Sequence, residues 1–392
     1  MNSHKSPDVI VIGGGIVGAF ASYYLVKEGL EVLLVDKGSI ASGTSCAGEG
    51  GIAITNKTVG KDMELATESL RLYSQLSEEI GDEMEFRKTG GMSLAETEKD
   101  AEILKARLKL HSSLGIKTRW MDQKETIEVE PCLSPHIVGS SICEIEGQIN
   151  PMGTIFSILQ RSKKMGLKVS PFSRVSAIKC NKERVVSVEI GDKTVFTSMV
   201  VNAAGPWAPE IGEMVGIKIP ISPRRGILLV TEPLPPTVRH FINELSYLSM
   251  KLSPEEMARS PDDRFQKGVG FVLEQTKHGN LILGSSRQFV GYRKNVDITV
   301  IQHIVRRAIH FAPMFKQVKI IRTYAGLRPY TPDNLPIIGA VPGLEGFMIA
   351  AGHEGSGMTL GPITGKLISE CIVGKTPTIP IDKFNISRFG LE

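Results

Sequence analysis

The chain of 392 residues contains few cysteines, and no two of them lie close together in the sequence. Two cysteines separated by two residues are the usual signature of an iron–sulfur cluster or a structural zinc site. The five cysteines are scattered instead, at Cys46, Cys132, Cys143, Cys180 and Cys371. We therefore expect no cluster and no metal site in this chain. Free thiols of this kind fit a reducing compartment.

Histidine patterns for metal binding are absent as well. The eight histidines include no H-E-x-x-H motif. His303 and His310 lie seven residues apart on an expected helix, a spacing more typical of packing or surface contacts than of a metal site.

The chain also lacks a long hydrophobic run and a dense block of one charge. No stretch reaches the roughly 20 apolar residues of a membrane span, and Met1 to Pro7 is too short and polar for a signal peptide. The net charge is only +4, without a Lys/Arg cluster that would favour nucleic acid. We expect a soluble, cytoplasmic protein without a transmembrane segment and without nucleic-acid binding.

What is present is an ordinary globular composition and a strong N-terminal motif. Charged residues make up 22% and apolar residues 41%, and the length suggests two or three domains. Val9–Ile12 is an apolar run typical of a buried strand, and it leads into the G-x-G-x-x-G pattern of Gly13–Gly18. A helix over Ile16–Glu28 and a second strand over Glu31–Val35 follow, with Asp36 at its end.

Each residue type in this motif meets a physical need of dinucleotide binding. Gly13 makes a tight turn, Gly15 lets a pyrophosphate approach the backbone, and Gly18 allows close packing of helix on strand. The free N–H groups at the start of the helix hold the phosphates. Asp36 accepts hydrogen bonds from the ribose hydroxyls and repels a 2′-phosphate. Because all parts occur in the required order, the motif predicts a dinucleotide site rather than a plain βαβ unit with a glycine turn.

Two further segments are candidates for contact with the same ligand. Gly38–Gly51 is a loop rich in Gly, Ser and Thr, which suits close approach to a ligand, although a surface loop has similar composition. Cys46 lies in this loop, with no sign of a covalent link. Val200–Trp207 is read as a buried strand followed by a small-residue turn at Ala204 and Gly205, and an ordinary strand–turn–helix is the alternative.

The C-terminal part repeats the strand–glycine–helix pattern. Gly346–Ala351 is expected to be a strand, Gly352–Gly357 a glycine-rich turn and Met358–Cys371 a helix. The start of this helix is suited to face an isoalloxazine edge and to stabilise a reduced flavin. One such motif at each end of the chain is more typical of FAD than of NAD.

Other elements follow from periodicity and turn residues. An insertion around Pro233–Asp263 is interpreted as a lid or a partner surface. Helices are expected over Met63–Glu79, Glu96–Leu114 and Met152–Met165; strands over Phe86–Ala95, Ile221–Thr231 and Gly270–Ser285; antiparallel strands over Lys168–Cys180 and Val185–Glu189; and loop and strand over Glu125–Cys132 and Ser140–Ile149.

With these motifs the chain resembles the FAD-dependent amine and amino-acid oxidoreductase family that includes glycine oxidase, sarcosine oxidase and D-amino-acid oxidase. Within it, the likeness is greatest to catalytic subunits of multi-subunit dehydrogenases of proline, hydroxyproline or opines, and to the related subunit of hydrogen cyanide synthase. The run Glu274–Leu281 and the following Gly284–Arg287 point in that direction. The matching stretches are Asp8–Asp36, Gly43–Ile52, Val200–Trp207, Ala325–Gly339 and Gly352–Thr359.

The resemblance implies an α/β fold: a discontinuous Rossmann-type FAD-binding domain over residues 1–85, 145–220 and 321–392, and a mixed antiparallel-sheet substrate domain over residues 86–144 and 221–320. It implies hydride transfer from the amine-bearing carbon of an amino or imino acid to flavin N5, giving an imine that water hydrolyses. The residues expected to contact FAD are Gly13, Gly15, Ile16, Val17, Asp36, Lys37, Thr44, Ser45, Gly50, Gly51, Ile52, Val175, Ala204, Gly205, Trp207, His353, Gly355, Gly357, Met358 and Thr359.

Arg328 matches the family position whose guanidinium holds the substrate carboxylate, a task suited to its planar fork. The alternative is an arginine that ties a loop to an acid such as Asp333. Tyr330 and Tyr292 are expected as pocket aromatics, and His353 as a flavin or loop contact rather than a general base. Glu354–Ser356 stands where glycine-oxidase-like sequences carry a basic residue, which weakens a strict glycine-oxidase assignment.

Three functions remain open at this level. The first is a dehydrogenase that passes electrons to a partner subunit carrying further cofactors. The second is an oxidase that reacts with oxygen and yields peroxide. The third, a flavin-binding subunit without turnover, is the least favoured because Arg328 accompanies a full set of flavin motifs.

Overall fold

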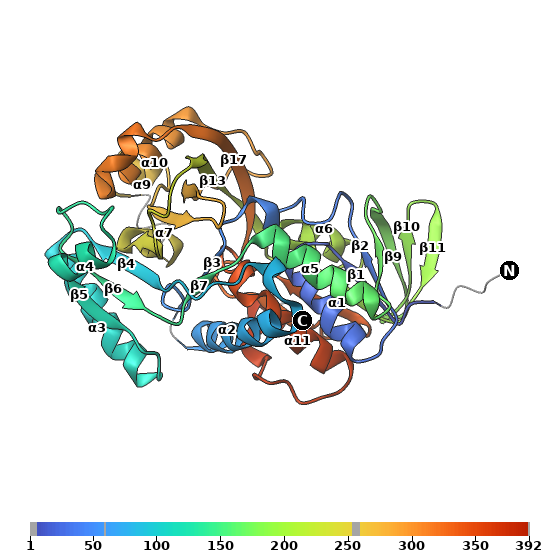
Figure 1. Cartoon of the computed structure of the whole chain (residues 1–392). Helices are drawn as coiled ribbons and strands as arrows, with labels where there is room; N and C mark the ends of the chain where they lie inside the picture. The colour runs from blue at the N-terminus through green and yellow to red at the C-terminus, as the bar shows by residue number, and fades with distance from the viewer. Residues whose placement is uncertain (1–5, 59, 253–258, 391–392) are drawn as a thin grey trace.

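Two large β-sheets organise the molecule. The computed structural model describes residues 6–58, 60–252 and 259–390. A six-stranded sheet with its helices forms one side, and an eight-stranded sheet forms the other (Figure 1). This arrangement confirms the predicted α/β fold class, with a Rossmann-type sheet and a mixed, largely antiparallel sheet.

The six-stranded sheet has the order β18-β19-β12-β1-β2-β8. Its strands are parallel except for β18, which runs antiparallel to β19 at one edge. The strands are β1 (Val9–Ile12), β2 (Val32–Val35), β8 (Lys168–Ser170), β12 (Val200–Asn202), β18 (Ile337–Ala340) and β19 (Phe347–Ala351).

Both faces of this sheet are buried, so β1 is apolar at every position. Side chains alternate between the faces of a strand. Val9 and Val11 pack in the core formed with the long helices, whereas Ile10 and Ile12 pack in a second core on the other face.

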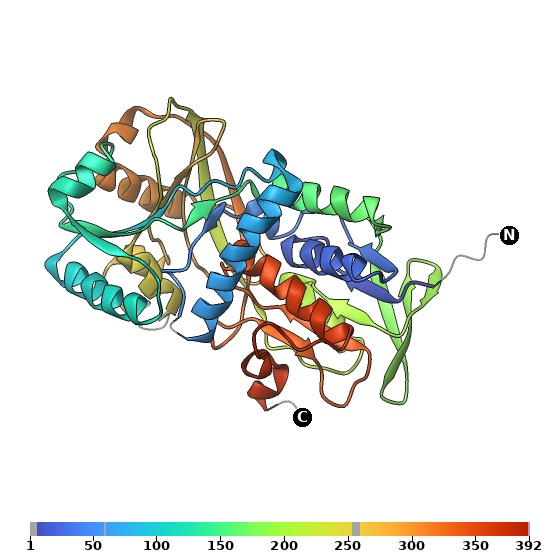
Figure 2. The same cartoon turned by 60° about the horizontal axis from the view of Figure 1, so that its bottom comes forward.

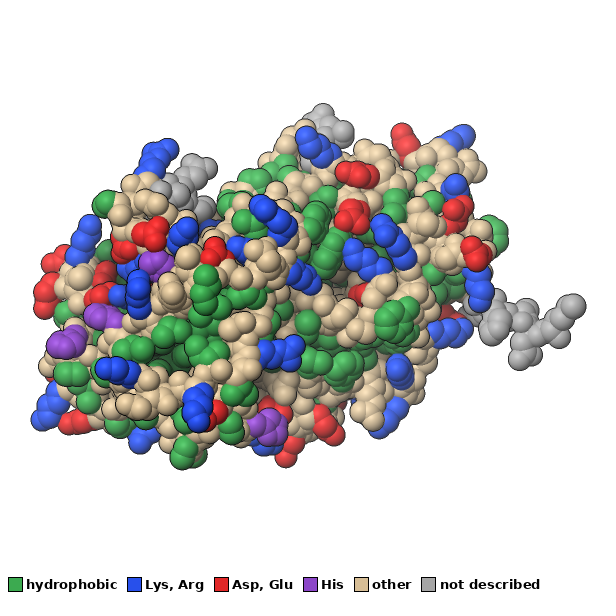
Figure 3. Space-filling view, turned by 90° about the horizontal axis from the view of Figure 1, so that it is seen from above, with side chains coloured by type: hydrophobic (Ala, Val, Ile, Leu, Met, Phe, Trp, Pro, Cys, Tyr) green, Lys and Arg blue, Asp and Glu red, His purple; other side chains and the backbone are tan. Residues whose placement is uncertain are grey.

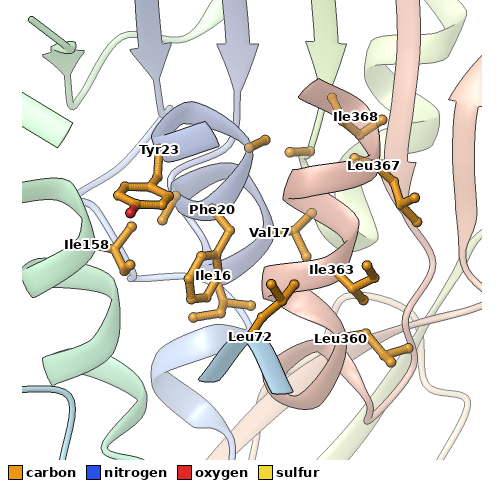
Figure 4. Packing of buried hydrophobic residues seen from close by; sticks show 14 of the residues in the cluster. Ile16, Val17, Phe20, Tyr23, Leu72, Ile158, Leu360, Ile363, Leu367 and Ile368 are labelled. Atoms are coloured by element: carbon orange, nitrogen blue, oxygen red, sulfur yellow. The ribbon is translucent and has the colours of Figure 1, made fainter. Parts of the chain in front are cut away.

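Four helices pack together on the first face: α1 (Ile16–Lys27), α2 (Lys61–Ile80), α5 (Pro151–Lys164) and α11 (Gly357–Ile372) (Figure 2). Helices α1 and α11 approach closely: Ile16 and Phe20 lie against Gly361, and Val17 lies between the two helices (Figure 4). A Cβ atom at Gly365 would lie 2.5 Å from the Phe20 carbonyl carbon, so only glycine fits there. This packing joins the N-terminal motif to its C-terminal counterpart.

The eight-stranded sheet has the order β17-β13-β16-β15-β14-β4-β6-β5. All of its pairs are antiparallel except β14 with β4. Helix α10 (Ile298–Phe311) packs against it through Val300, Ile304 and Phe311. The strands are β4 (Gly91–Ala95), β5 (Arg119–Asp122), β6 (Gly139–Cys143), β13 (Ser222–Pro233), β14 (Phe241–Glu244), β15 (Val272–Gln275), β16 (Asn280–Gly284) and β17 (Ile320–Tyr330).

Smaller elements complete the described residues. The strands β9 (Val175–Asn181), β10 (Arg184–Ile190) and β11 (Lys193–Phe196) form a three-stranded antiparallel sheet, and β3 (Gly51–Ile52) pairs with β7 (Gly147–Gln148). The remaining helices are α3 (Glu98–Ser113), α4 (Gln123–Val129), α6 (Ala208–Glu213), α7 (Leu245–Leu252) and α9 (Asp263–Gln266).

Several expectations differ from the structure. The segment Lys168–Cys180 is divided: β8 joins the six-stranded sheet parallel to β2, and only β9 pairs antiparallel with β10. Helix α4 replaces the loop expected at Glu125–Cys132, because Asp122 and Glu125 form a capping box that starts a helix.

Two further expectations concern the substrate side of the molecule. The insertion around Pro233–Asp263 supplies β14, an inner strand of the eight-stranded sheet, so this part of it is core; residues 253–258 lie outside the described residues. The predicted boundary at residue 321 divides β17, which belongs to the eight-stranded sheet. The domain limits otherwise stay a prediction.

The surface carries charges of both signs. On the face drawn in Figure 3, Lys and Arg side chains are interspersed with acidic and hydrophobic ones.

Candidate active site

A cavity of about 360 Å³ opens at the carboxyl ends of β1, β2, β12 and β19, the edge where open parallel sheets bind ligands. Most of the predicted contact residues line it. They are Gly13, Gly15, Ile16, Val17, Asp36, Lys37, Thr44, Ser45, Val175, Ala204, Gly205, Trp207, Arg328, His353, Gly355, Gly357 and Met358.

One end of the cavity is formed by the N-terminal motif. Gly13 has a φ of +113°, and a Cβ atom there would lie 2.5 Å from the Ala203 carbonyl oxygen, so the turn requires glycine. The Asp36 carboxylate accepts the Gly14 N–H at 2.7 Å and the Gly38 N–H at 2.8 Å. These bonds hold the acid at the end of β2, beside the start of α1.

The other end carries arginines on the eight-stranded sheet. Strands β13 and β17 pair so that Arg224 lies opposite Arg328, and Gly226 opposite Gly326. The Arg328 guanidinium donates to the Ser286 carbonyl oxygen at 2.7 Å and to Ser285 Oγ at 3.1 Å. Like charges directly opposite each other destabilise a sheet unless an anion compensates them.

Glu354 supplies part of this compensation. Its Oε1 lies 3.1 Å from Arg287 Nε and 3.5 Å from Arg224 Nη1, and all these side chains are buried. Burial lowers the pKa of Arg224 to about 10, although Glu354 opposes the shift. Burial would also lower the pKa of Arg287, but Glu354 and Tyr247 raise it above the ordinary value.

The arginine group, defined as Arg224, Arg287 and Arg328, has more charge than Glu354 can neutralise. Three guanidinium groups against one carboxylate leave a formal excess of two positive charges. In the described part of the chain, Arg287 Nη1 is buried without a hydrogen-bond partner. Buried charge of this kind is costly unless it is paired, so this end of the cavity is suited to bind an anion.

Comparison with known proteins identifies the family. The model of the FAD-dependent oxidoreductase family DAO matches residues 8–371. The chain belongs to this family.

Relatives and solved structures agree over nearly the whole chain. Hydrogen cyanide synthase subunit HcnC of Pseudomonas aeruginosa is 25% identical, covering 99% of this chain and 98% of its own length. Glycine oxidase of Geobacillus kaustophilus is 25% identical, covering 97% of both chains. The structure of L-proline dehydrogenase from P. horikoshii has a TM-score of 0.89 and 26% identity over 98% of both chains. The predicted family, the FAD cofactor and the assignment as an oxidoreductase are confirmed.

The N-terminal end of the cavity fits the nucleotide half of FAD. Ser45 Oγ accepts the Ile16 N–H at 3.0 Å, and a Cβ atom at Gly15 would lie 3.1 Å from this oxygen. The bare backbone at Gly15 and the start of α1 are therefore suited to hold the pyrophosphate. Each Asp36 oxygen, although bonded to the backbone, retains a lone pair for a ribose hydroxyl.

Lys37 and Trp207 form a side wall of the same region. The Lys37 ammonium lies 4.1 Å from the centroid of the Trp207 ring, a cation–π contact. This contact fixes the ring at the cavity, where both residues were predicted.

His353 is placed where a general base would be sought, but its environment opposes that role. It is buried, and its Nε2 lies 2.9 Å from Thr364 Oγ1. Burial lowers its pKa to about 3, so the imidazole is neutral and very weakly basic. The prediction of a contact residue rather than a base is consistent with this geometry.

Four residues predicted to contact FAD lie beside the cavity without lining it. The Gly50 N–H donates to Glu274, Gly51 packs under the Phe241 ring, Ile52 is fully buried, and Thr359 Oγ1 accepts the Ala53 N–H. Their contacts hold the loop before β3 in place, which gives them a structural part in shaping the site.

The two predicted pocket aromatics also lie outside the cavity wall. Tyr292 is 46% exposed, stacks on Trp207 and donates to the Pro206 carbonyl oxygen. Tyr330 packs against Phe289, and both rings lie beside the Arg224 guanidinium. Neither tyrosine lines the cavity; Tyr292 contacts Trp207, which does, and Tyr330 contacts Arg224.

The alternative for Arg328, a tie to Asp333, is wrong. Asp333 accepts from Arg388, at 2.7 Å and 3.2 Å, whereas Arg328 faces the cavity. Sequence reasoning did not find Arg224 and Arg287, because their proximity to Arg328 depends on strand pairing. Arg287 did lie in the quoted run Gly284–Arg287, and that run was the available signal.

The described residues contain neither a membrane-spanning helix nor a metal-binding cluster. None of their helices is long and apolar enough to cross a membrane. In the same ranges, no group of three or more His, Cys, Asp and Glu side chains could hold a metal ion.

Proposed function

We propose that the chain oxidises a small amino or imino acid at the carbon bearing the amine. The observation that carries this proposal is the buried arginine group, only partly neutralised by Glu354, at the wall of the FAD cavity. Relatives named glycine oxidase and L-proline dehydrogenase support it. Candidate substrates are glycine, sarcosine, D- or L-proline, hydroxyproline, another D-amino acid and an opine.

Arg328 binds the substrate carboxylate in this proposal. It is the member of the arginine group that lines the cavity, and its guanidinium is oriented by Ser285 and Ser286. Arg224 and Arg287 add positive charge behind it and are held by Glu354. Bound FAD would supply the acceptor for the hydride, so the chain's own residues mainly position the substrate.

In the form of the proposal that we favour, the electrons pass from FAD to a partner subunit. The chain has no closely spaced cysteines for an iron–sulfur cluster, so the cofactors of such a relay would lie in another chain. The relative named as a dehydrogenase supports this form, and the relative named as an oxidase supports direct reaction with oxygen. A cytoplasmic location stays a prediction.

An anaerobic titration of the yellow protein tests the proposal. Each candidate amino acid is added in turn, and bleaching of the flavin absorbance band is followed. We expect one or more of them to bleach the band, and Arg328→Ala to need a far higher concentration while it keeps its FAD. Rapid return of colour in air indicates an oxidase, and slow return indicates a dehydrogenase. If no amino acid bleaches FAD-loaded protein, the proposed substrate class is wrong.

A further inference from the structure

Among the described residues four carboxylates line the cavity, and three of them have cationic side chains or two backbone N–H groups as partners. Asp36 accepts two backbone N–H groups, and Glu354 pairs with two arginines. Glu210 lies 3.9 Å from Lys37 and 4.0 Å from Arg174. Glu49 differs: within residues 6–58, 60–252 and 259–390, the only polar contact recorded for its carboxylate is the Tyr247 hydroxyl, which donates at 3.1 Å.

The loop that carries Glu49 is anchored on β17. Thr44 Oγ1 donates to the Leu327 carbonyl oxygen at 2.5 Å. A Cβ atom at Gly326 would lie 3.0 Å from the Ala47 carbonyl oxygen, so the loop touches the strand where it has no side chain. Glu49 is thereby held at the cavity wall by contacts on the strand that also carries Arg328.

Alternation along β17 sets the order of groups on this wall. Tyr324, Gly326 and Arg328 share one face because side chains repeat every second residue. Burial raises the pKa of Tyr324, and the charges of Glu49 and Glu274 raise it further, so both acids lie near enough to interact with its phenol. The paired glycines Gly226 and Gly326 leave room for other groups to lie on the strands: the Arg328 guanidinium covers Gly226, and Ala47 of the Glu49 loop covers Gly326.

Tyr247 contacts both Arg287 of the arginine group and Glu49. The Arg287 guanidinium carbon lies 4.2 Å from the centroid of the Tyr247 ring, while the hydroxyl of the same ring donates to Glu49. The phenol thus stands between the arginine group and Glu49. In the described residues Glu49 makes no ion pair, and its carboxylate retains acceptor capacity toward the cavity.

A second acid, Glu274, lies close to Glu49 because it binds the neighbouring Gly50. Its side chain is only 5% exposed, and its Oε1 accepts the Gly50 N–H at 2.8 Å. Burial raises its pKa to about 8, and the charge of Glu49 contributes to the shift. A carboxyl group that keeps its proton near neutral pH adds no negative charge beside Glu49.

We propose that Glu49 binds the positively charged nitrogen of the substrate while Arg328 binds its carboxylate. The cavity then selects a zwitterion: a molecule with a cationic amine at one end and a carboxylate at the other. This inference rests on the proposed function and specifies it, because it separates amino acids from hydroxy acids and cyclic ethers of the same shape. Glu49 contributes recognition of the amine, and the bare backbone at Gly226 and Gly326 lets Arg328 and the Glu49 loop lie close to the strands.

The test compares matched ligands on FAD-loaded protein. For the amino acid that bleaches the wild type, the partner ligand has oxygen in place of nitrogen: glycolate for glycine, or tetrahydrofuran-2-carboxylate for proline. The amino acid is assayed by its KM and rate of flavin bleaching, and the oxygen ligand by inhibition. We expect Glu49→Gln to weaken the amino acid about ten- to a hundredfold, the usual size for a hydrogen bond to a charged group, and to leave the oxygen ligand nearly unchanged.

Two variants keep this test interpretable. Glu49→Asp retains the charge on a shorter side chain and should recover part of the selectivity. Glu144→Gln removes an exposed carboxylate outside the cavity and should behave as the wild type. Retained selectivity in FAD-loaded Glu49→Gln overturns this inference alone, because bleaching of the wild type would still support amino-acid oxidation. Failure of every amino acid to bleach the wild type overturns the proposed function as well.

Discussion

Replacing Gly226 by alanine should damage the substrate site without removing FAD. A Cβ atom at this position would lie 2.1 Å from Arg328 Nη1, whereas an ordinary contact needs about 3.4 Å. The guanidinium must therefore move by about 1.3 Å (3.4 minus 2.1). Its bonds to Ser286 O at 2.7 Å and Ser285 Oγ at 3.1 Å cannot both survive such a shift.

The expected magnitude follows from losing one hydrogen bond to a charged group, which is worth about 1.5–3 kcal/mol. A tenfold change corresponds to about 1.4 kcal/mol, so KM for the amino acid should rise roughly 10- to 150-fold. Steady-state or anaerobic bleaching kinetics measure KM, and the flavin-to-protein absorbance ratio measures FAD content. The ratio should stay at its wild-type value, because Gly226 contacts Arg328 rather than the Asp36 end of the cavity.

The neighbouring residue offers a matched control. Ile227 is on the same strand with its side chain in the core of the eight-stranded sheet, so Ile227→Val should cost about 0.5–1.5 kcal/mol of stability and leave KM unchanged. Gly226→Ala added to Arg328→Ala should produce little further loss, because both act through one guanidinium. A wild-type KM in FAD-loaded Gly226→Ala would show that the Arg328 position does not control substrate binding.

The nucleotide end of the site was accessible from sequence because its parts are contiguous. Strand, glycine turn, helix and acid lie within Val9–Asp36, and local spacing fixes how they meet. Gly13 adopts the positive φ expected of the turn, and Asp36 lies at the cavity. Most predicted FAD contacts were therefore brought to one place.

The substrate end could be predicted only at Arg328. Its opposite residue, Arg224, is about a hundred positions away, and their meeting depends on the register of β13 against β17. Periodicity identifies each strand but carries no information on which strand it pairs with. Glu354 and Arg287 come from two further segments, so the charge balance of the group is a property of the tertiary fold.

Local signals were also missed where a competing pattern was stronger. The capping box of Asp122 and Glu125 was present in the sequence, but the short α4 has too few apolar positions to show helical periodicity. The strand β14 was hidden because prolines before it gave the whole segment the composition of an insertion.

Three other variants test separate parts of the structure. Asp36→Ala removes an acceptor of two backbone N–H groups and of the expected ribose hydroxyls; we expect roughly 10-fold or greater loss of FAD affinity, measured by flavin retained after desalting, and full occupancy would contradict the role. Gly365→Ala forces a Cβ atom to within 2.5 Å of the Phe20 backbone and should lower the free energy of unfolding by roughly 1–3 kcal/mol, more than Gly361→Ala, where the nearest contact is the Ile16 side chain at 3.0 Å. Glu274 has a pKa raised by burial from 4.5 to about 8, so the folded state binds a proton that the unfolded state releases, and this stability is lost as pH rises through that interval. Glu274→Gln, which keeps an acceptor for the Gly50 N–H, should therefore unfold at a higher temperature than the wild type at pH 9 and reduce the decline, by up to about 1.4 kcal/mol per pH unit, between pH 5 and 8. Parallel pH profiles of the two proteins would mean that Glu274 is already ionised in the folded state, and Glu49 would then have a second anion behind it.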